Sequence, residues 1–415
     1  MSPASTLPKI RSRVELARVV VDRPTQVESP AGSAGTVIHF TPSVGGGGAE
    51  AMLCNLVEAM RGGPWRQVIV AVKTGGSGCQ AARMRNVADA FYDLNSSSLM
   101  RPALFRKLRE IIRVEKPDVV QTWMHHADFV GGLAARFGGV KHIVWGIHSR
   151  SIFRWPGESV LKYALFNAAL RIASRSIPER IISCSETAID DHAGMGFPRQ
   201  KMTFIANGIC TRRFQPSNEA GAKTRRALRI PLDAPVVGFV GRFHPVKNLE
   251  LFFRAVAEMQ KRMPGAHFVL SGGSASMLDK KASAAYQALQ DRSTLRFVPF
   301  SATTESLYPA FSVFSLCSES EALPMTVLEA MSCGVPCVTT DVGDCASVMA
   351  DTGLVVPPGS ATALADGWIK MLSADAASRN SLSRRARDRV VSEFSITHAA
   401  AQYESTYRQL VGQAA

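Results

Sequence analysis

Residues 36–60 read TVIHFTPSVGGGGAEAMLCNLVEAM, and this stretch decides the fold class. Residues 36–40 are β-branched or aromatic with one histidine, and after the four glycines the apolar residues recur at helical spacing. The order is therefore strand, glycine loop and helix. Glycines at 45–48 let the backbone approach a ligand, and the N-terminus of the following helix can receive a phosphate group. No Lys-Ser or Lys-Thr pair follows, which argues against a Walker A loop, and Glu50 stands where the third glycine of GxGxxG would fall.

The same alternation continues along the chain. Further strand-like runs are 67–72, 118–123, 142–147, 180–185, 235–241, 267–273, 295–300, 313–318, 336–341 and 353–358. Strands that alternate with helical material predict parallel sheets covered by helices on both faces. The segment 211–234 interrupts the pattern with prolines and charges, and 415 residues exceed one hydrophobic core, so two domains are expected.

The predicted organisation has four parts. Residues 1–35 form a disordered extension, 36–210 an N-terminal Rossmann-like domain, 211–390 a C-terminal Rossmann-like domain, and 391–415 a closing helix. Ligands of open α/β sheets bind beyond the carboxyl ends of the strands. The site is therefore expected in a cleft between the two domains.

Composition restricts the class of protein and its compartment. The net charge is +14, with most of the excess in residues 1–210, which suits nucleic acid, an anionic membrane or phosphorylated ligands. The eight cysteines are scattered and show no disulfide framework, and Cys333 and Cys337 lack a second pair for zinc, so a cytoplasmic protein without a metal site is expected. No uncharged apolar run of about 18 residues occurs, so no membrane span is predicted.

Residues 318–337, SESEALPMTVLEAMSCGVPC, place two carboxylates around a short helix. Pro324 suits the first turn and Gly334 the position after the last, so Glu321 lies in the preceding loop and Glu329 on the helix. A helix N-terminus with nearby carboxylates can bind a phosphorylated, polyhydroxylated ligand. From spacing alone, Glu321 as a solvated loop residue and Glu329 as a surface acid remain an alternative.

Residues 238–248, GFVGRFHPVKN, place two cations directly after a buried strand. Arg242 and Lys247 would emerge at the carboxyl end of that strand, where they could neutralise a diphosphate leaving group. The alternative is an ordinary basic surface loop.

Together these motifs resemble those of a retaining glycosyltransferase of the GT-B architecture, in the large group 4 family. The resemblance covers about residues 36–372 and rests on five landmarks: GGAE at 47–50, NG at 207–208, GRFHPVKN at 241–248, the motif from 318 to 344, and TGLVVPPGS at 352–360. Residues 120–137 also look like the branch associated with bacterial surface polysaccharide assembly. The implied fold is α/β GT-B, with two Rossmann-like doubly wound domains facing across a cleft. The resemblance also implies that residues 36–210 bind the acceptor and residues 211–390 the nucleotide-sugar.

The resemblance implies roles for particular residues. Glu321, the first glutamate of the EX7E pattern, would lie near the hydroxyls of the transferred sugar, and Glu329 would bind the nucleotide ribose. Arg242 and Lys247 would hold the diphosphate. The residues expected to line the donor pocket from the two domains are Gly47, Gly48, Leu323, Met325 and Thr326.

His148 matches the active-site histidine of the family, with His125 and His126 as rival candidates. Asn207 and Gly208 would make the turn into the linker. The chain departs from the family pattern at two places. Ala206 and Cys210 replace the usual proline and aspartate around Asn-Gly, and Ala322-Leu323 replaces the usual Gly-Phe after the first glutamate. The second departure alters the pocket against the sugar.

The expected reaction transfers a sugar, with retention, from a nucleotide-diphosphate sugar, UDP-linked by preference, to a glycan or lipid-linked acceptor. No cofactor or metal is expected, because the cationic groups can do the work of a metal. The alternatives are a GT-B epimerase, a nucleic-acid-binding protein, which lacks a recognisable binding motif here, and an inactive binding subunit. Residues 101–117 and 150–175 both combine apolar and basic side chains, so either could contact an anionic inner membrane leaflet, and a domain helix with a solvated basic face is the alternative.

Overall fold

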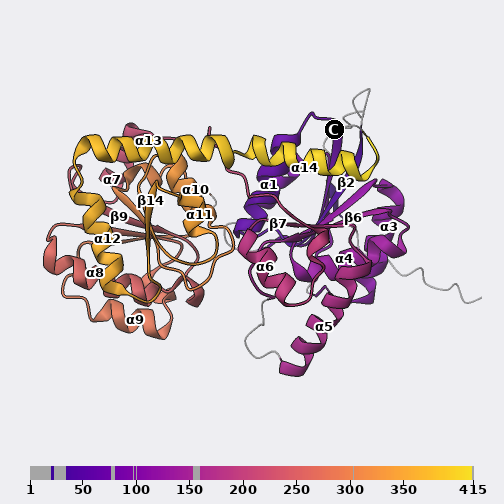
Figure 1. The fold of residues 1–415 in the computed structure, drawn as a ribbon, viewed down its shortest axis with the longest axis horizontal. Helices are drawn as coiled ribbons and strands as arrows, with labels where there is room; N and C mark the ends of the chain where they lie inside the picture. Colours follow the sequence, from indigo (N-terminus) through magenta and orange to yellow (C-terminus); the bar gives the residue numbers. More distant parts are fainter. Residues whose placement is uncertain are drawn as a thin grey trace, which may run out of the picture.

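The computed structural model describes residues 20–22, 34–75, 80–96, 98–99, 101–152, 159–301 and 303–413. They form two α/β domains that lie side by side, each built around its own sheet (Figure 1). The predicted fold class, two Rossmann-like doubly wound domains, is confirmed.

The first sheet has the order β1-β4-β3-β2-β5-β6-β7-β8. Every neighbouring pair is parallel except β1 with β4. The strands are β1 (Val20–Asp22), β2 (Gly35–Ser43), β3 (Trp65–Lys73), β4 (Ala90–Asp93), β5 (Val119–Thr122), β6 (His142–Ile147), β7 (Arg180–Ser183) and β8 (Met202–Phe204). The chain order reverses between β2 and β5, and this switch point is where open α/β sheets bind ligands.

Alternating side chains of β2 supply the cores on the two faces of this sheet. Val37 packs with helix α1 (Gly48–Met60), whereas Ile38 and Phe40 belong to the core under helices α3 (Pro102–Glu115) and α4 (His125–Phe137). The remaining helices of this domain are α2 (Ala81–Val87), α5 (Val160–Ser176) and α6 (Glu186–Gly194).

The second sheet is fully parallel and has the order β11-β10-β9-β12-β13-β14. Its strands are β9 (Val236–Val240), β10 (His267–Ser271), β11 (Leu295–Val298), β12 (Val313–Leu316), β13 (Cys337–Thr340) and β14 (Gly353–Val356). Its helices are α7 (Asn218–Ala227), α8 (Leu249–Arg262), α9 (Lys280–Gln287), α10 (Met325–Ser332), α11 (Cys345–Met349), α12 (Ala361–Ser373) and α13 (Ala376–Glu393). The switch point here lies between β9 and β12, which carry the two motifs that the sequence singles out.

The chain crosses between the domains at two adjacent places. Ile209 and Ser395 form a bridge, in which the Ile209 N–H donates to the Phe394 carbonyl at 2.8 Å. A Cβ atom on Gly208 would lie 2.6 Å from Ile396 Cα, so only glycine allows the two crossings to come this close. Asn207 and Gly208 therefore lie at the start of the linker, but in extended chain and not in a hydrogen-bonded turn as predicted.

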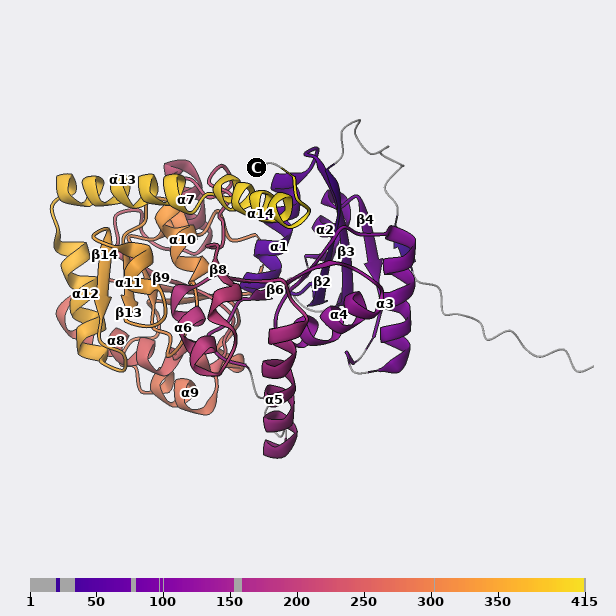
Figure 2. The ribbon, with the colours of Figure 1, turned by 45° about the vertical axis from the view of Figure 1, so that its right-hand side comes forward.

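The C-terminal helix α14 (Ile396–Leu410) returns to the first domain (Figure 1). Tyr407 is fully buried there and packs edge-on against Trp65, with ring centroids 5.7 Å apart. Helix α13 instead stays on the second domain, so the segment from 376 to 410 spans both (Figure 2). The closing helix of the sequence prediction thus corresponds to a helix that begins at Ile396.

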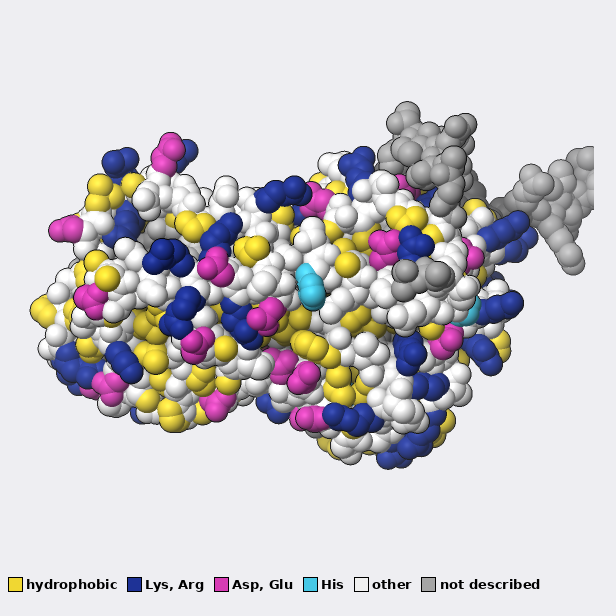
Figure 3. All heavy atoms as spheres, turned by 45° about the horizontal axis from the view of Figure 1, so that its top comes forward, with side chains coloured by type: hydrophobic (Ala, Val, Ile, Leu, Met, Phe, Trp, Pro, Cys, Tyr) yellow, Lys and Arg dark blue, Asp and Glu magenta, His cyan; other side chains and the backbone are white. Residues whose placement is uncertain are grey.

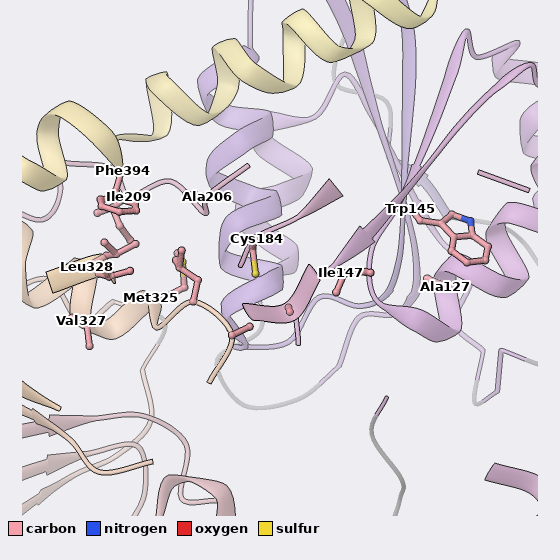
Figure 4. Close-up of a cluster of buried hydrophobic side chains, with 14 of the residues drawn as sticks. Ala127, Trp145, Ile147, Cys184, Ala206, Ile209, Met325, Val327, Leu328 and Phe394 are labelled. Carbon is pink, nitrogen blue, oxygen red and sulfur yellow. The ribbon is translucent and has the colours of Figure 1, made fainter. Parts of the chain in front are cut away.

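An apolar cluster continues from one domain into the other (Figure 4). It includes Ile147 and Cys184 of the first domain, Met325 and Leu328 of the second, and Ile209 of the linker. The domains are therefore in van der Waals contact close to the switch points.

The extension predicted to be disordered lies mostly outside the described residues. Within it, Val20–Asp22 form β1, paired with β4, and β2 already begins at Gly35. Strands β1, β4 and β8 were not predicted. They have three or four residues each, too few for a clear apolar pattern.

Candidate active site

The loop after β9 and the loop after β12 meet at the switch point of the second sheet. Lys247 ends a short 3₁₀ turn that starts at Pro245, and its Nζ donates to Glu321 Oε1 at 2.5 Å. Ser318 Oγ donates to the same oxygen at 2.6 Å, and the Glu319 N–H donates to the Val246 carbonyl at 2.8 Å. The structure therefore brings together Lys247 and Glu321, which are 74 residues apart in sequence.

Arg242 lies on the same loop and its side chain is exposed. Burial lowers the pKa of His244, and the positive charges of Arg242 and Lys247 lower it further. Arg242 and Lys247 thus place two positive charges on one short loop. The lowered pKa of His244 favours its neutral imidazole. A loop with this charge favours a bound anion.

Helix α10 begins beside this loop. Pro324 is its N-cap, and the Pro324 carbonyl accepts from the N–H groups of Val327 and Leu328 at 3.1 and 3.3 Å. The first N–H groups of the helix, those of Met325 and Thr326, have no partner within the helix and can receive phosphate oxygens. The helix is shorter than the predicted ten residues, and Pro324 precedes its first turn rather than belonging to it.

The glycine loop of the first domain lies against this helix terminus. Gly47 is the N-cap of α1, and a Cβ atom on Gly48 would lie 3.3 Å from Met325 Cγ. Leu323 and Met325 are buried, 6% and 8% exposed. The predicted donor-pocket residues of the two domains therefore do meet at the domain junction.

Glu329 lies on the body of α10, one turn from its start, and is partly buried. Its carboxylate accepts a hydrogen bond from the hydroxyl of Tyr308, a fully buried side chain. Burial raises the pKa of Glu329 to about 7, although the Tyr308 hydrogen bond opposes this shift. Glu329 is therefore not a solvated surface acid, and near neutral pH it exists in both protonation states.

The sequence offers three candidates for the active-site histidine, His125, His126 and His148. His148 directly follows β6, and its ring stacks on Trp123 with centroids 4.8 Å apart. Burial lowers the pKa of His148 to about 4, although the Asn207 side chain opposes the shift. Neither ring nitrogen makes a hydrogen bond of good geometry to any residue that the structure describes. His148 is thus a neutral imidazole at the carboxyl edge of the first sheet.

The rival histidines have structural partners. His125 Nε2 lies 2.7 Å from His192 Nε2, and His192 Nδ1 lies 2.7 Å from the Ala188 carbonyl. The ring of His126 stacks on Phe166 with centroids 4.6 Å apart. This geometry favours His148 over both rivals for a role in binding or catalysis.

Sequence reasoning missed two features of the junction. Asp344 precedes α11 in the second domain, and its carboxylate accepts from the N–H groups of Glu186 and Thr187 at 2.9 and 3.2 Å and from Thr187 Oγ1 at 2.6 Å. It therefore occupies the N-terminus of α6 in the first domain. The final aspartate of the motif at 318–344 was the available signal, but its partner is 157 residues away.

The second missed feature is an aromatic stack behind His148. Trp123 lies between His148 and Tyr403 of α14, with the Tyr403 ring centroid 6.2 Å from that of Trp123. No sequence pattern near Trp123 predicts that Tyr403, on the C-terminal helix, packs against it.

Two Rossmann-like domains with a cationic loop, a helix N-terminus and a glycine loop at their junction define a class of enzymes that bind a phosphorylated nucleotide ligand. Two protein-family models match most of the chain. Residues 46–213 match the model described as Glycosyltransferase Family 4, and residues 222–389 match that described as Glycosyl transferases group 1. The chain belongs to these GT-B glycosyltransferases.

Individual relatives agree with this assignment. The chain is 26% identical over 313 residues to a protein of Bacillus subtilis named as the glycosyltransferase EpsF, covering 74% of this chain and 79% of the relative. It is 24% identical over 316 residues to an Escherichia coli UDP-Gal:alpha-D-GlcNAc-diphosphoundecaprenol alpha-1,3-galactosyltransferase, covering 73% and 78%. The solved structure of Anabaena Alr3699/HepE in complex with UDP-glucose superposes with a TM-score of 0.77 at 18% identity, covering 90% of this chain and 100% of that one. The last similarity concerns the fold.

Proposed function

We propose that the protein is a retaining, metal-independent glycosyltransferase that moves a hexose from a UDP-sugar to a hydroxyl of a lipid-linked glycan in surface polysaccharide or glycolipid assembly. The observation that carries this proposal is the meeting of Lys247 and Glu321 at the start of α10, opposite Gly48. The choice of UDP draws on the E. coli relative and on the Anabaena complex, both of which have UDP-sugars in their names. A lipid-linked acceptor draws on the E. coli relative alone.

The described residues divide the work of binding the donor. Arg242, Lys247 and the N–H groups of Met325 and Thr326 hold the diphosphate, and the Glu329 carboxylate accepts from the ribose hydroxyls. Glu321 Oε1 accepts from Lys247 Nζ and Ser318 Oγ, which leaves the other carboxylate oxygen to accept from hydroxyls of the transferred sugar. Leu323, two residues after Glu321 and buried, would give this pocket an apolar wall.

The chemical step breaks the bond between the sugar C1 and the diphosphate oxygen. The acceptor oxygen attacks C1 on the face from which the diphosphate departs, and the acceptor proton passes to the departing phosphate oxygen, so the anomeric configuration is retained. Negative charge grows on that oxygen, and the two cations and the helix N-terminus stabilise it. His148, being neutral, donates a hydrogen bond to a hydroxyl of the transferred sugar.

A donor and acceptor screen tests this proposal. The full-length protein is incubated with UDP- and GDP-sugars, each with and without a polyprenyl-diphosphate-linked sugar and with and without EDTA, and nucleotide release is measured. Proton NMR of the product gives the anomeric configuration. Acceptor-dependent release of UDP, retained configuration and indifference to EDTA support the proposal. Conversion of the donor without acceptor would favour an epimerase, and an inverted product would refute the mechanism.

A further inference from the structure

Helix α5 exposes large apolar side chains. Val160, Leu161, Leu165 and Ile172 are 62–67% exposed, although each is large enough to belong in a core. The helix also extends beyond the rest of the first domain, as both ribbon views show (Figures 1 and 2). Isolated exposed leucines need no explanation, but four such residues on one helix do.

Leu161, Leu165 and Ile172 form one stripe, whereas Val160 lies about 100° from Leu161 around the helix. At 100° per residue, positions 161, 165, 168 and 172 lie along a single face of a helix. The opposite face packs on the domain through Leu170 and Ala173, which are 0% and 8% exposed. Helix α5 is therefore apolar on two sides, one covered by its own domain and one uncovered.

The charges of α5 are all positive. Between Val160 and Ser176 there is no aspartate or glutamate, and the three basic residues Lys162, Arg171 and Arg175 are all exposed. In the same helical projection, Arg171 and Arg175 border the stripe on one side and Lys162 on the other. A helix with an apolar stripe between basic edges has the pattern of one that lies in a membrane interface.

Helix α3 provides the contrast. It carries the other basic segment of the sequence, but its aliphatic residues Leu104, Leu108, Ile111 and Ile112 are buried, and Val114 alone of its large aliphatic side chains is exposed. Its basic face is therefore the solvated side of a domain helix. The structure separates the two segments that looked alike in the sequence.

Basic residues elsewhere show no comparable arrangement on the face drawn in Figure 3. There Lys and Arg side chains occur on both domains, with acidic side chains among many of them. No described helix is both long and apolar enough to cross a bilayer.

We propose that α5 docks the protein onto an anionic bilayer, with Leu161, Leu165 and Ile172 in the acyl region and the flanking cations at lipid phosphates. A bilayer fits better than a protein partner because the stripe is bordered by cations on both sides and the chain carries a net charge of +14. Helix α5 also packs close to the candidate site, since Phe166 of α5 stacks on His126 of α4, and α4 begins two residues after Trp123, on which His148 stacks. This proposal rests on the proposed function in one respect: a lipid-linked acceptor would lie in the membrane to which α5 binds.

Vesicle flotation tests the docking surface. Full-length protein is mixed with vesicles of phosphatidylcholine containing about a third phosphatidylglycerol, at about 50 mM salt and again at about 500 mM, where charges are strongly screened. Wild-type protein should float with anionic vesicles at low salt, and much less at high salt or with phosphatidylcholine alone. Leu161→Gln/Leu165→Gln/Ile172→Gln, which leaves the charge unchanged, should reduce binding at least tenfold.

A matched pair of variants separates position from charge. Lys162→Gln/Arg171→Gln/Arg175→Gln on α5 and Arg106→Gln/Arg109→Gln/Arg113→Gln on α3 each remove three exposed cations. The α5 variant should lose most of its binding, whereas the α3 variant should lose little. Equal losses would overturn the proposal, and so would wild-type protein that stays with the aqueous phase at low salt.

Two further measurements keep the test specific. All variants should keep the circular dichroism and thermal midpoint of the wild type and its transfer to a water-soluble acceptor, so a failure of docking is distinguishable from a failure of the proposed activity. Analytical ultracentrifugation without lipid should show a monomer. A dimer that dissociates in the Leu161→Gln/Leu165→Gln/Ile172→Gln variant would assign the stripe to a second copy of the chain and overturn membrane docking.

Discussion

The state of Glu329 makes donor binding depend on pH. Its carboxylate is partly buried beside Tyr308, and burial raises its pKa to about 7. In the proposed function the ribose hydroxyls donate to this carboxylate, so only the ionised form accepts both. The ionised fraction is about 0.9 at one pH unit above the pKa and about 0.1 at one unit below it. The apparent Kd for the donor should therefore be about tenfold higher at pH 6 than at pH 8.

Isothermal titration calorimetry with a UDP-sugar measures this dependence. A UDP-sugar is preferred over UDP because its diphosphate has no terminal phosphate that gains or loses a proton in this range. At pH 7 about half a proton should be released on binding, seen as a dependence of the heat on the buffer. Glu329→Gln should bind more weakly and independently of pH. Tyr308→Phe removes a hydrogen bond that favours the ionised form, so it should move the midpoint to higher pH.

The same shift predicts a gain in stability for Glu329→Gln. The folded pKa of Glu329, about 7, lies above its ordinary value of 4.5, so folding favours the protonated form. Stability is therefore lost as the pH rises from about 4.5 to about 7, by as much as ~3 kcal/mol in the limit of full burial. Glutamine does not ionise, so the variant should unfold at a higher temperature than the wild type at pH 8 and at a similar one at pH 5. A flat Kd for the wild type between pH 6 and 8, with no stabilisation of the variant at pH 8, would refute this reasoning.

Three further predictions concern the junction. Lys247→Ala should lower kcat by on the order of 100 to 1,000-fold in a nucleotide-release assay, with a smaller effect on the donor Kd, because it removes a cation from the leaving group; an unchanged kcat would contradict its role. Asp344→Ala removes three hydrogen bonds between the domains, so small-angle X-ray scattering should show a larger radius of gyration, and Asp344→Asn should show a smaller change. Trp123→Leu should lower kcat but not donor affinity, because it removes the ring on which His148 stacks; the reasoning fails if donor affinity falls while kcat stays the same.

Most strands could be predicted because they are buried on both faces and read as continuous apolar runs. The run at 236–240 is an example, since all five residues of β9 are buried. Strand β8 was missed for the opposite reason: Met202 and Thr203 are half-buried and Phe204 is 36% exposed. A short strand at the sheet edge has little apolar pattern to detect.

The meeting of the two motifs of the second domain was largely predictable, because their residues follow strands at fixed spacings within one domain. Lys247 and Glu321 meet because β9 and β12 are neighbours and each motif starts where its strand ends. The choice among histidines was not predictable. His125 pairs with His192, which lies 67 residues further along the chain. His148 stacks on Trp123, and Trp123 stacks on Tyr403 of the C-terminal helix.

The candidate catalytic and binding side chains come from both domains, so the proposed reaction depends on how the two domains are placed relative to each other. The second domain supplies the cations, the helix N-terminus and both glutamates, whereas the first supplies Gly48 and His148. In the proposed function neither set acts on a sugar without the other, so the close approach of Gly48 to Met325 would be required for turnover. Asp344 holds the domains together on one side of this contact, and the Gly208 crossing joins them on another. Helix α14 packs on the first domain and places Tyr403 against Trp123, so the segment that crosses back at Ser395 also carries a ring of the stack behind His148.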